Sequence, residues 1–501
     1  MNKPKHQQRT RKPVRPSVSG TGGAAPLDQG ASDETLLTRR RFLYGAAGVG
    51  AAAAIGAGVY AIRSASDAEK GTTINVGDVE VPVLEVPEGA LTTLNDFQDL
   101  ESAEGHVQLV GNFDLPYGTL VWVTDDSVAA CLLPTDSGSP LSQVGLLSLG
   151  NGTMTTALKK AVGTKDHFEI YDVRATSSGL IWTEANILNG TWRVYCAKTS
   201  GNTPGKSKLL EEGNDAYETP TLAVCKNRCF WQVLPKLPND AGLTSRLMGA
   251  TFGKDDATCV YESARRMGTP PYSAGDAVVI SPRVDSPTVY HQLTCIDAES
   301  GQVSDQLTLP HGMAPLEAAY GTTGFAFSFA NIYDYGGGIS NLGTYTPLKR
   351  PDGGDYGNAS WFGFARTPSA APAWSSNLLI VKSSYSVCGV DLAAGTYFAL
   401  DVENGADSYG EYLASQGTRD TFVTFTNIDH QPVNAKETHA CRVKVWTPIS
   451  GGSTQKRTDS DEDGYYDDNG EWHDYADESG LTMDPQTISL DGETPEPEIE
   501  A

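Results

Sequence analysis

The chain has 501 residues and a formal net charge of −25. This length can bury a large core, and the excess of carboxylates argues against a nucleic-acid-binding protein, which needs a basic face to neutralise phosphates. The charge is unevenly spread: residues 1–44 carry nine Lys/Arg against three Asp/Glu, residues 45–454 carry 26 against 43, and residues 455–501 carry 2 against 16. The sequence therefore divides into a basic arm, an acidic body and a more acidic tail.

The N-terminal part contains one long uncharged segment, residues 42–62. The preceding residues 1–37 are rich in Lys, Arg, Pro, Gln and Ser, a composition that predicts a disordered arm. As a helix, the 21 uncharged residues would span about 31 Å, enough to cross a hydrocarbon core of about 30 Å. The positive charge before the segment predicts a cytoplasmic N-terminus and an exported body. A buried Ala/Gly helix of a cytosolic protein is the alternative.

The residues that open this segment, Thr38-Arg39-Arg40-Arg41-Phe42-Leu43, resemble the twin-arginine (Tat) export signal. In that signal a Ser or Thr precedes two arginines, any residue, Phe and Leu; the matching positions here are Arg39, Arg40, Phe42 and Leu43. The resemblance implies export by the Tat translocase, with residues 38–68 as the signal. Cleavage would release a secreted protein, whereas an uncleaved signal would leave a single-pass anchor. Residues 69–105 are expected to be a linker.

The body shows a repeated strand pattern. Residues 179–201 read as an apolar strand, an Asn-Gly turn and a second strand, which is typical of a β-hairpin. The unit recurs about every 50 residues, the span of a four-stranded propeller blade. The marker is a large apolar residue three places after each turn: Trp122, Trp182, Trp231, Val279, Phe327, Ile380 and Val423. We therefore predict an all-β fold, a β-propeller over residues 106–454, with seven blades preferred over six or eight. An array of two-sheet sandwiches is the alternative.

Two turns carry a family resemblance. Asp297 to Gly301 and Asp391 to Gly395 each have the spacing Asp-x-x-x-Gly and resemble the turns of quinoprotein- and TolB-like propellers. The tryptophan that follows this glycine in quinoproteins is missing in both, so the resemblance implies the architecture and no quinone cofactor. The body is similar to a WD40/TolB/quinoprotein-like propeller, although it lacks the Trp-Asp dipeptide of WD40 blades.

Three long segments are expected between the second and third strands of their blades, and hence on one face: residues 234–245, 330–341 and 427–437. Loops on one face of a propeller are the natural binding surface. Aromatic rings beside a carboxylate suit stacking on a sugar or gripping a peptide. The candidate ligand-binding residues are Tyr333, Asp334, Tyr335, Glu184, Arg283, Asp429 and His430. The alternative is that these are ordinary solvated loop residues.

Cysteines and acidic residues supply the remaining candidates. Eight cysteines follow the signal, and a bridge between Cys225 and Cys229 across a three-residue turn is the pairing that spacing suggests. In the tail, carboxylates at alternate positions resemble a calcium loop, at Asp459, Asp461, Asp463 and Asp467. Gly470 stands where such a loop needs a bidentate Glu, so the alternative is a disordered acidic tail over residues 455–501.

No HExxH zinc motif and no Gly-x-Ser-x-Gly nucleophile motif is present. We therefore predict no catalytic residue and no cofactor other than calcium in the tail. The expected function is that of an exported or membrane-anchored propeller that binds a protein, peptide or glycan of the cell envelope. The alternative is an exported propeller enzyme, either a glycan hydrolase or lyase or a cofactor-bearing oxidoreductase.

Overall fold

The computed structural model contains two compact units, residues 1–448 and 449–501, which are described separately. The structure describes residues 73–449, apart from 77–78, 87–90, 137–139, 237–242, 287, 331–333, 349–355, 357–359 and 430–438, and two short strands at 464–466 and 472–474. Within these residues the first unit is built of β-strands, with two short 3-10 turns at Leu94–Asp96 and Thr164–Asp166.

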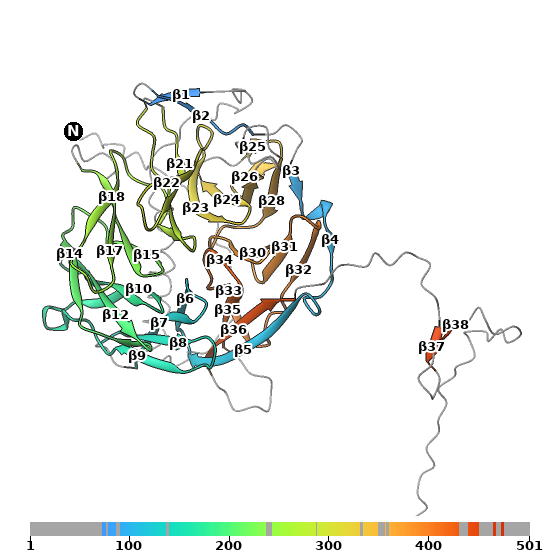
Figure 1. The fold of residues 1–501 in the computed structure, drawn as a ribbon, viewed down its shortest axis with the longest axis horizontal. Helices are drawn as coiled ribbons and strands as arrows, with labels where there is room; N and C mark the ends of the chain where they lie inside the picture. The colour runs from blue at the N-terminus through green and yellow to red at the C-terminus, as the bar shows by residue number, and fades with distance from the viewer. Residues whose placement is uncertain are drawn as a thin grey trace, which may run out of the picture. The chain divides into compact units, whose positions relative to one another are not determined.

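Seven sheets of four to six strands follow one another around a ring (Figure 1). We name them sheets I to VII in the order in which they follow one another along the chain. Sheet I holds β6 (Leu120–Val123), β7 (Val128–Pro134), β8 (Ser142–Ser148) and β9 (Met154–Leu158). Sheet II holds β10 (Glu169–Thr176), β11 (Gly179–Asn186), β12 (Thr191–Ser200), β13 (Thr203–Pro204) and β14 (Lys208–Gly213). Sheet III holds β15 (Thr221–Cys225), β16 (Arg228–Val233), β17 (Ser245–Thr251) and β18 (Thr258–Ser263).

The other four sheets repeat the up-and-down order. Sheet IV holds β19 (Tyr272–Ser273), β20 (Ala277–Ile280), β21 (Gln292–Asp297) and β22 (Val303–Thr308). Sheet V holds β23 (Ala314–Gly321), β24 (Gly324–Ala330), β27 (Gly343–Pro347), β28 (Trp361–Ala365) and β3 (Leu91–Thr93). Sheet VI holds β34 (Thr418–Arg419), β29 (Ala373–Ser375), β30 (Leu378–Lys382), β31 (Val387–Asp391), β32 (Thr396–Ala399) and β4 (Gln98–Asp99). Sheet VII holds β33 (Ala406–Leu413), β35 (Phe422–Ile428), β36 (Ala440–Pro448) and β5 (Val107–Pro116). This arrangement is a β-propeller.

The N-terminal strands join the outer edges of the last three sheets. β5 pairs antiparallel with β36 and so completes sheet VII with a strand from the other end of the domain. β3 and β4 pair parallel with the outermost strands of sheets V and VI. Residues 91–99 are therefore part of the folded unit, and the expected linker over 69–105 does not hold for them. The outer edge offers unpaired backbone groups, which these strands satisfy.

The apolar marker of the sequence repeat falls on the second strand of six sheets. Trp182, Trp231, Val279, Phe327, Ile380 and Val423 are all 0% exposed, because a second strand has sheet neighbours on both sides and packed sheets on both faces. Trp122 differs: it lies on β6, the first strand of sheet I, and is partly exposed. Because the sequence of β6 is as apolar as that of a second strand, the marker wrongly assigned Trp122 to a second strand.

The two Asp-x-x-x-Gly turns are confirmed as turns between third and fourth strands. The Asp297 carboxylate accepts the Ser300 N–H at 2.7 Å, and the Asp391 carboxylate accepts the Ala394 N–H at 2.9 Å. Gly301 and Gly395 have φ values of +70° and +68°, a conformation that favours glycine.

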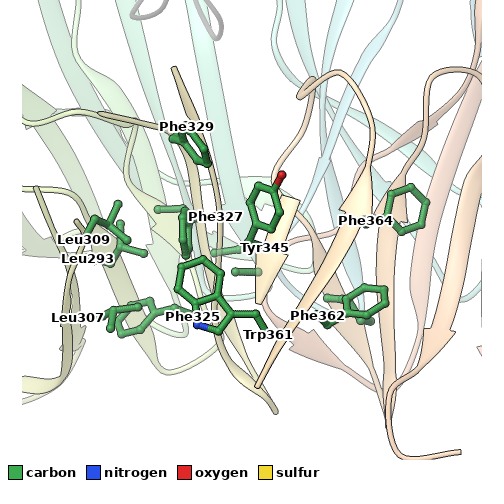
Figure 2. Packing of buried hydrophobic residues seen from close by; sticks show 14 of the residues in the cluster. Leu293, Leu307, Leu309, Phe325, Phe327, Phe329, Tyr345, Trp361, Phe362 and Phe364 are labelled. Carbon is green, nitrogen blue, oxygen red and sulfur yellow. The ribbon is translucent and has the colours of Figure 1, made fainter. Parts of the chain in front are cut away.

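Aromatic side chains fill the space between sheets IV and V. Figure 2 shows Phe325, Phe327 and Phe329 of β24 in a cluster with Tyr345, Trp361 and the leucines of sheet IV. The Phe327 and Trp361 ring centroids are 5.7 Å apart with the planes nearly perpendicular, a favourable aromatic geometry. The ring is thus held by cores between successive sheets.

One segment ties together sheets that are not neighbours in the ring. Residues 414–419, which follow β33 and include β34, form hydrogen bonds through their backbone groups with sheets I, IV and VI. Gln416 N–H donates to the Val123 carbonyl at 2.9 Å, and Gly417 N–H donates to the Tyr272 hydroxyl at 2.6 Å. Arg419 reaches Asp126 of sheet I at 3.6 Å. We call residues 414–419 the crossing segment.

Several sequence expectations lie outside the described residues: the expected Tat signal over residues 38–68, the uncharged segment 42–62 within it, and the four aspartates of the expected calcium loop. No helix in the described part of the chain is long and apolar enough to cross a membrane. In the second unit, β37 (Gly464–Tyr466) pairs antiparallel with β38 (Trp472–Asp474). This hairpin interrupts the segment that was expected to be a disordered tail.

Candidate functional site

The strand order sends two kinds of connection to opposite faces of the ring. Because neighbouring strands of a sheet run antiparallel, the connections from second to third strands share one face with those that lead into the next sheet. We call this face the loop face and the opposite one the turn face. The three long segments expected between second and third strands join β16 to β17, β24 to β27 and β35 to β36, so their predicted place is confirmed. The second of them contains a small hairpin, β25 (Asp334–Gly336) with β26 (Ile339–Ser340).

Exposed apolar side chains gather on the loop face. Twelve large apolar side chains are exposed among the described residues. Six of them lie on loop-face connections: Val162, Ile187, Leu188, Val289, Leu342 and Tyr385. Leu188 is 95% and Ile187 63% exposed. The described residues that join first to second strands, on the turn face, contribute none. Exposed apolar side chains that share one face make that face the candidate surface for a ligand or partner.

Glu184, one of the predicted ligand-binding residues, is fully buried at the loop-face end of β11. Its carboxylate accepts the backbone N–H groups of Val162 and Gly163 at 2.6 and 2.9 Å and the indole N–H of Trp182 at 3.0 Å. Burying a carboxylate is costly unless it is hydrogen-bonded, and these three donors satisfy it. The structure therefore gives Glu184 the task of holding the connection between sheets I and II.

The other predicted residues are spread over the loop face. Tyr333 and His430 lie outside the described residues, and Asp334 is placed on β25. Tyr335 is partly buried and packs against the core of sheet V. The Asp429 carboxylate accepts a hydrogen bond from the Tyr117 hydroxyl, and the Tyr117 ring meets His439 edge-on at 5.4 Å. Tyr117 and His439 were not predicted, because the first follows β5, a strand far away in sequence.

Arg283 lies on the connection between β20 and β21, where it forms an isolated backbone β-bridge with His291. Its Nε–H is buried without an acceptor, and no ion pair involves its guanidinium within the residues that the structure describes. Burial and the neighbouring charge of Arg265 both lower the pKa of Arg283. The loop face therefore has a cation without a counter-charge at this point.

His291, the bridge partner of Arg283, is an uncharged histidine at neutral pH. Burial lowers its pKa to about 4, and the charge of Arg283 lowers it further, against a hydrogen bond with the Met313 backbone. The imidazole therefore carries no charge at pH 7, so it neither repels the Arg283 guanidinium as a cation nor attracts it as an anion. Sequence reasoning missed it, since its burial depends on sheet V.

Buried charges also lie between the later sheets, close to the loop face. Arg366, which directly follows β28 of sheet V, forms an ion pair with Glu317 of β23 in the same sheet, with side-chain exposures of 0% and 10%. Lys444 lies 3.3 Å from Glu411 and 3.2 Å from Glu403. Burial lowers the pKa of Lys382, next to this group, to about 8. Each of these charged groups has a partner within the protein, so they are not candidate ligand-binding residues.

The expected bridge between Cys225 and Cys229 is wrong. Cys225 pairs with Arg228 across the β15–β16 hairpin, and Cys229 is the next residue along β16. Successive residues of a strand point to opposite faces of a sheet, so the two thiols diverge: Cys225 joins the core towards sheet IV, and Cys229 the core towards sheet II. All eight cysteines are free, and only Cys259 of them is exposed.

The described part of the chain holds no group of three or more His, Cys, Asp or Glu side chains that could bind a metal ion. The candidate site is therefore a surface: the loop face, with its exposed apolar side chains and with Arg283 and Arg265, two arginines that have no carboxylate partner among the described residues.

No protein-family model and no curated protein sequence matches this chain. Several solved structures are similar in fold. A prolyl endopeptidase matches with 10% identity and a TM-score of 0.40 over 64% of this chain and 46% of its own, and a puromycin hydrolase with 12% and 0.40 over 78% and 60%. The chain thus spans about half the length of these two enzymes. The propeller domain of the trilobed protease from Pyrococcus furiosus matches with 8% and 0.36 over 67% of this chain and 97% of its own. These similarities concern the fold alone.

Proposed function

We propose that this protein is an exported or membrane-anchored β-propeller of the cell envelope, and that it binds a protein, peptide or glycan through its loop face. The observation that carries the proposal is the distribution of exposed apolar side chains. Six lie on loop-face connections, which belong to sheets II, IV, V and VI and to the link between sheets I and II. A side chain such as Leu188, 95% exposed, gains about 1.5–3 kcal/mol when a partner buries it.

The architecture supports a binding surface in two further ways. The cores between successive sheets and the crossing segment make the ring rigid, so loops mounted on it lose little conformational entropy when they bind. We also propose that each of sheets I to VII is one blade, which gives seven blades and seven sets of loops. Export through the Tat route remains part of the proposal, supported by Arg39, Arg40, Phe42 and Leu43.

The test is a binding screen with the full-length protein on arrays of envelope glycans and peptides. Leu188→Ser is expected to weaken the strongest interaction about 10-fold or more, because buried apolar area is lost at the interface. The matched control is Leu209→Ser. Leu209 is 47% exposed but lies on β14, the outermost strand of sheet II, and its replacement should leave the affinity unchanged.

Two results would contradict the proposal. One is an equal effect of both substitutions, since the loop face would then have no special role. The other is turnover of an array ligand, or a bound chromophore in the purified protein, which would favour the propeller enzyme instead.

A further inference from the structure

Most of the arginines in the described residues are paired with carboxylates. Seven of the ten arginines in the described residues have a carboxylate oxygen within 4.0 Å: Arg174, Arg193, Arg246, Arg266, Arg366, Arg419 and Arg442. Of the other three, Arg228 donates to the Glu299 carbonyl at 3.4 Å. The remaining two are Arg265 and Arg283, whose connections are joined by a hydrogen bond from the Gly268 N–H to the Ser281 carbonyl at 2.8 Å. In a body with 43 acidic residues, two neighbouring arginines without a carboxylate are an exception that needs an explanation.

The surroundings of Arg283 make this exception costly. Its Nε–H is buried and has no acceptor, and buried donors are normally satisfied. The charge of Arg265 repels it and lowers its pKa. The imidazole of His291 interacts with the Met313 backbone and contributes no negative charge. Both arginines would gain from an anion placed beside them.

The position of the pair indicates what kind of anion. Arg265 lies on the connection that leads from β18 to β19, and Arg283 on the connection from β20 to β21, so both are on the loop face. Arg265 is exposed and Arg283 partly so, which leaves them accessible from solvent. Val289, on the same connection as Arg283, is 38% exposed. The planar guanidinium matches the two oxygens of a carboxylate, sulfate or phosphate group.

We propose that Arg283 and Arg265 form an oxyanion site on the loop face, which takes a carboxylate, sulfate or phosphate group of the ligand. The proposal deepens the proposed function, because it names the chemical group that the same face recognises. An oxyanion at this site would relieve the repulsion between the two cations. It would also provide acceptors for guanidinium donors that the protein itself leaves unpaired.

The test is isothermal titration calorimetry of the full-length protein at pH 7 with sodium sulfate, sodium phosphate and sodium acetate in separate arms, at constant ionic strength set with chloride. Saturable binding is expected in at least one arm, and the arms distinguish the three oxyanions. Arg283→Gln should weaken that binding about 10- to 100-fold, the effect of losing charge-assisted hydrogen bonds. Arg265→Gln should weaken it in the same arm, and this residue is exposed, so its replacement leaves the fold intact.

The matched control is Arg266→Gln. Arg266 is next to Arg265 in sequence, but its guanidinium is already paired with Glu218 at 2.7 Å, so the affinity should change less than twofold. The inference is overturned if no arm shows saturable binding, or if Arg266→Gln weakens binding as much as Arg283→Gln. Either result leaves the role of Leu188 in the array screen untouched. Conversely, if the protein binds an oxyanion but no ligand of the array, the proposed function is refuted and the oxyanion site is not.

Discussion

His291 predicts how the stability of the propeller responds to acid. Its pKa in the folded state is about 4, against an ordinary value of 6.5, chiefly because it is buried and secondly because Arg283 is near. Between these two values the unfolded chain binds a proton that the folded chain does not. Stability is therefore fully present above pH 6.5 and is lost as the pH falls towards 4. From pH 7 to pH 5 the loss from this one group is about 2 kcal/mol.

The perturbation that isolates this effect is His291→Gln, which keeps a side-chain hydrogen-bond donor but does not titrate. Urea unfolding of both proteins would be followed at pH 7 and pH 5, where most carboxylates stay ionised. The wild type should lose about 2 kcal/mol more free energy of unfolding than the variant between the two pH values. Equal losses in the two proteins would show that His291 is protonated normally in the folded state and would refute the assignment.

Three further predictions concern packing and accessibility. Gly417→Ala places a Cβ 2.8 Å from the Gly275 backbone N at a φ of +75°, so we expect the free energy of unfolding to fall by about 2–5 kcal/mol. The control Gly395→Ala has a φ of +68° but open space around the added Cβ, and it should cost about 1–2 kcal/mol. Similar losses in the two variants would contradict the tight contact at Gly417. Glu317→Leu leaves the Arg366 cation buried without its partner and should lower the free energy of unfolding, measured with denaturant, by about 3–5 kcal/mol. The double variant Glu317→Leu with Arg366→Met should recover most of this stability. If the double variant recovers none, the two residues do not form a buried pair. Native labelling with a maleimide, read by mass spectrometry, should modify Cys259 and spare the seven buried cysteines, and early labelling of any other cysteine would contradict the packing.

Much of the fold could be predicted from local patterns. The apolar marker identified the second strand of six sheets because burial on both sides demands large apolar residues there. The same marker failed at Trp122, since an inner strand can be equally apolar. The outer strand of sheet VII could not be predicted, because β5 pairs with β36 across more than 300 residues of sequence, and no local pattern reports such a pairing.

The position of the candidate site could be predicted from the sequence, but the interactions of its residues could not. The long loops and Arg283 follow from the strand order, yet the lack of a partner for Arg283 depends on which side chains other sheets bring near. Glu184 has the residue type of a ligand, but its three hydrogen bonds show a structural task. The bridge between Cys225 and Cys229 was inferred from spacing alone, and the pleat of β16 excludes it. The apolar pair Ile187 and Leu188 beside an Asn-Gly turn is a signal that the sequence itself contains.

The central claim, that the loop face binds the ligand, is tested most directly by hydrogen–deuterium exchange of the full-length protein with and without the strongest array ligand. The account predicts slower exchange in residues 186–191 and 281–291, which are loop-face connections, and no change in the turns at 176–179 and 225–228. Protection confined to those turns or to the outer strands would contradict it.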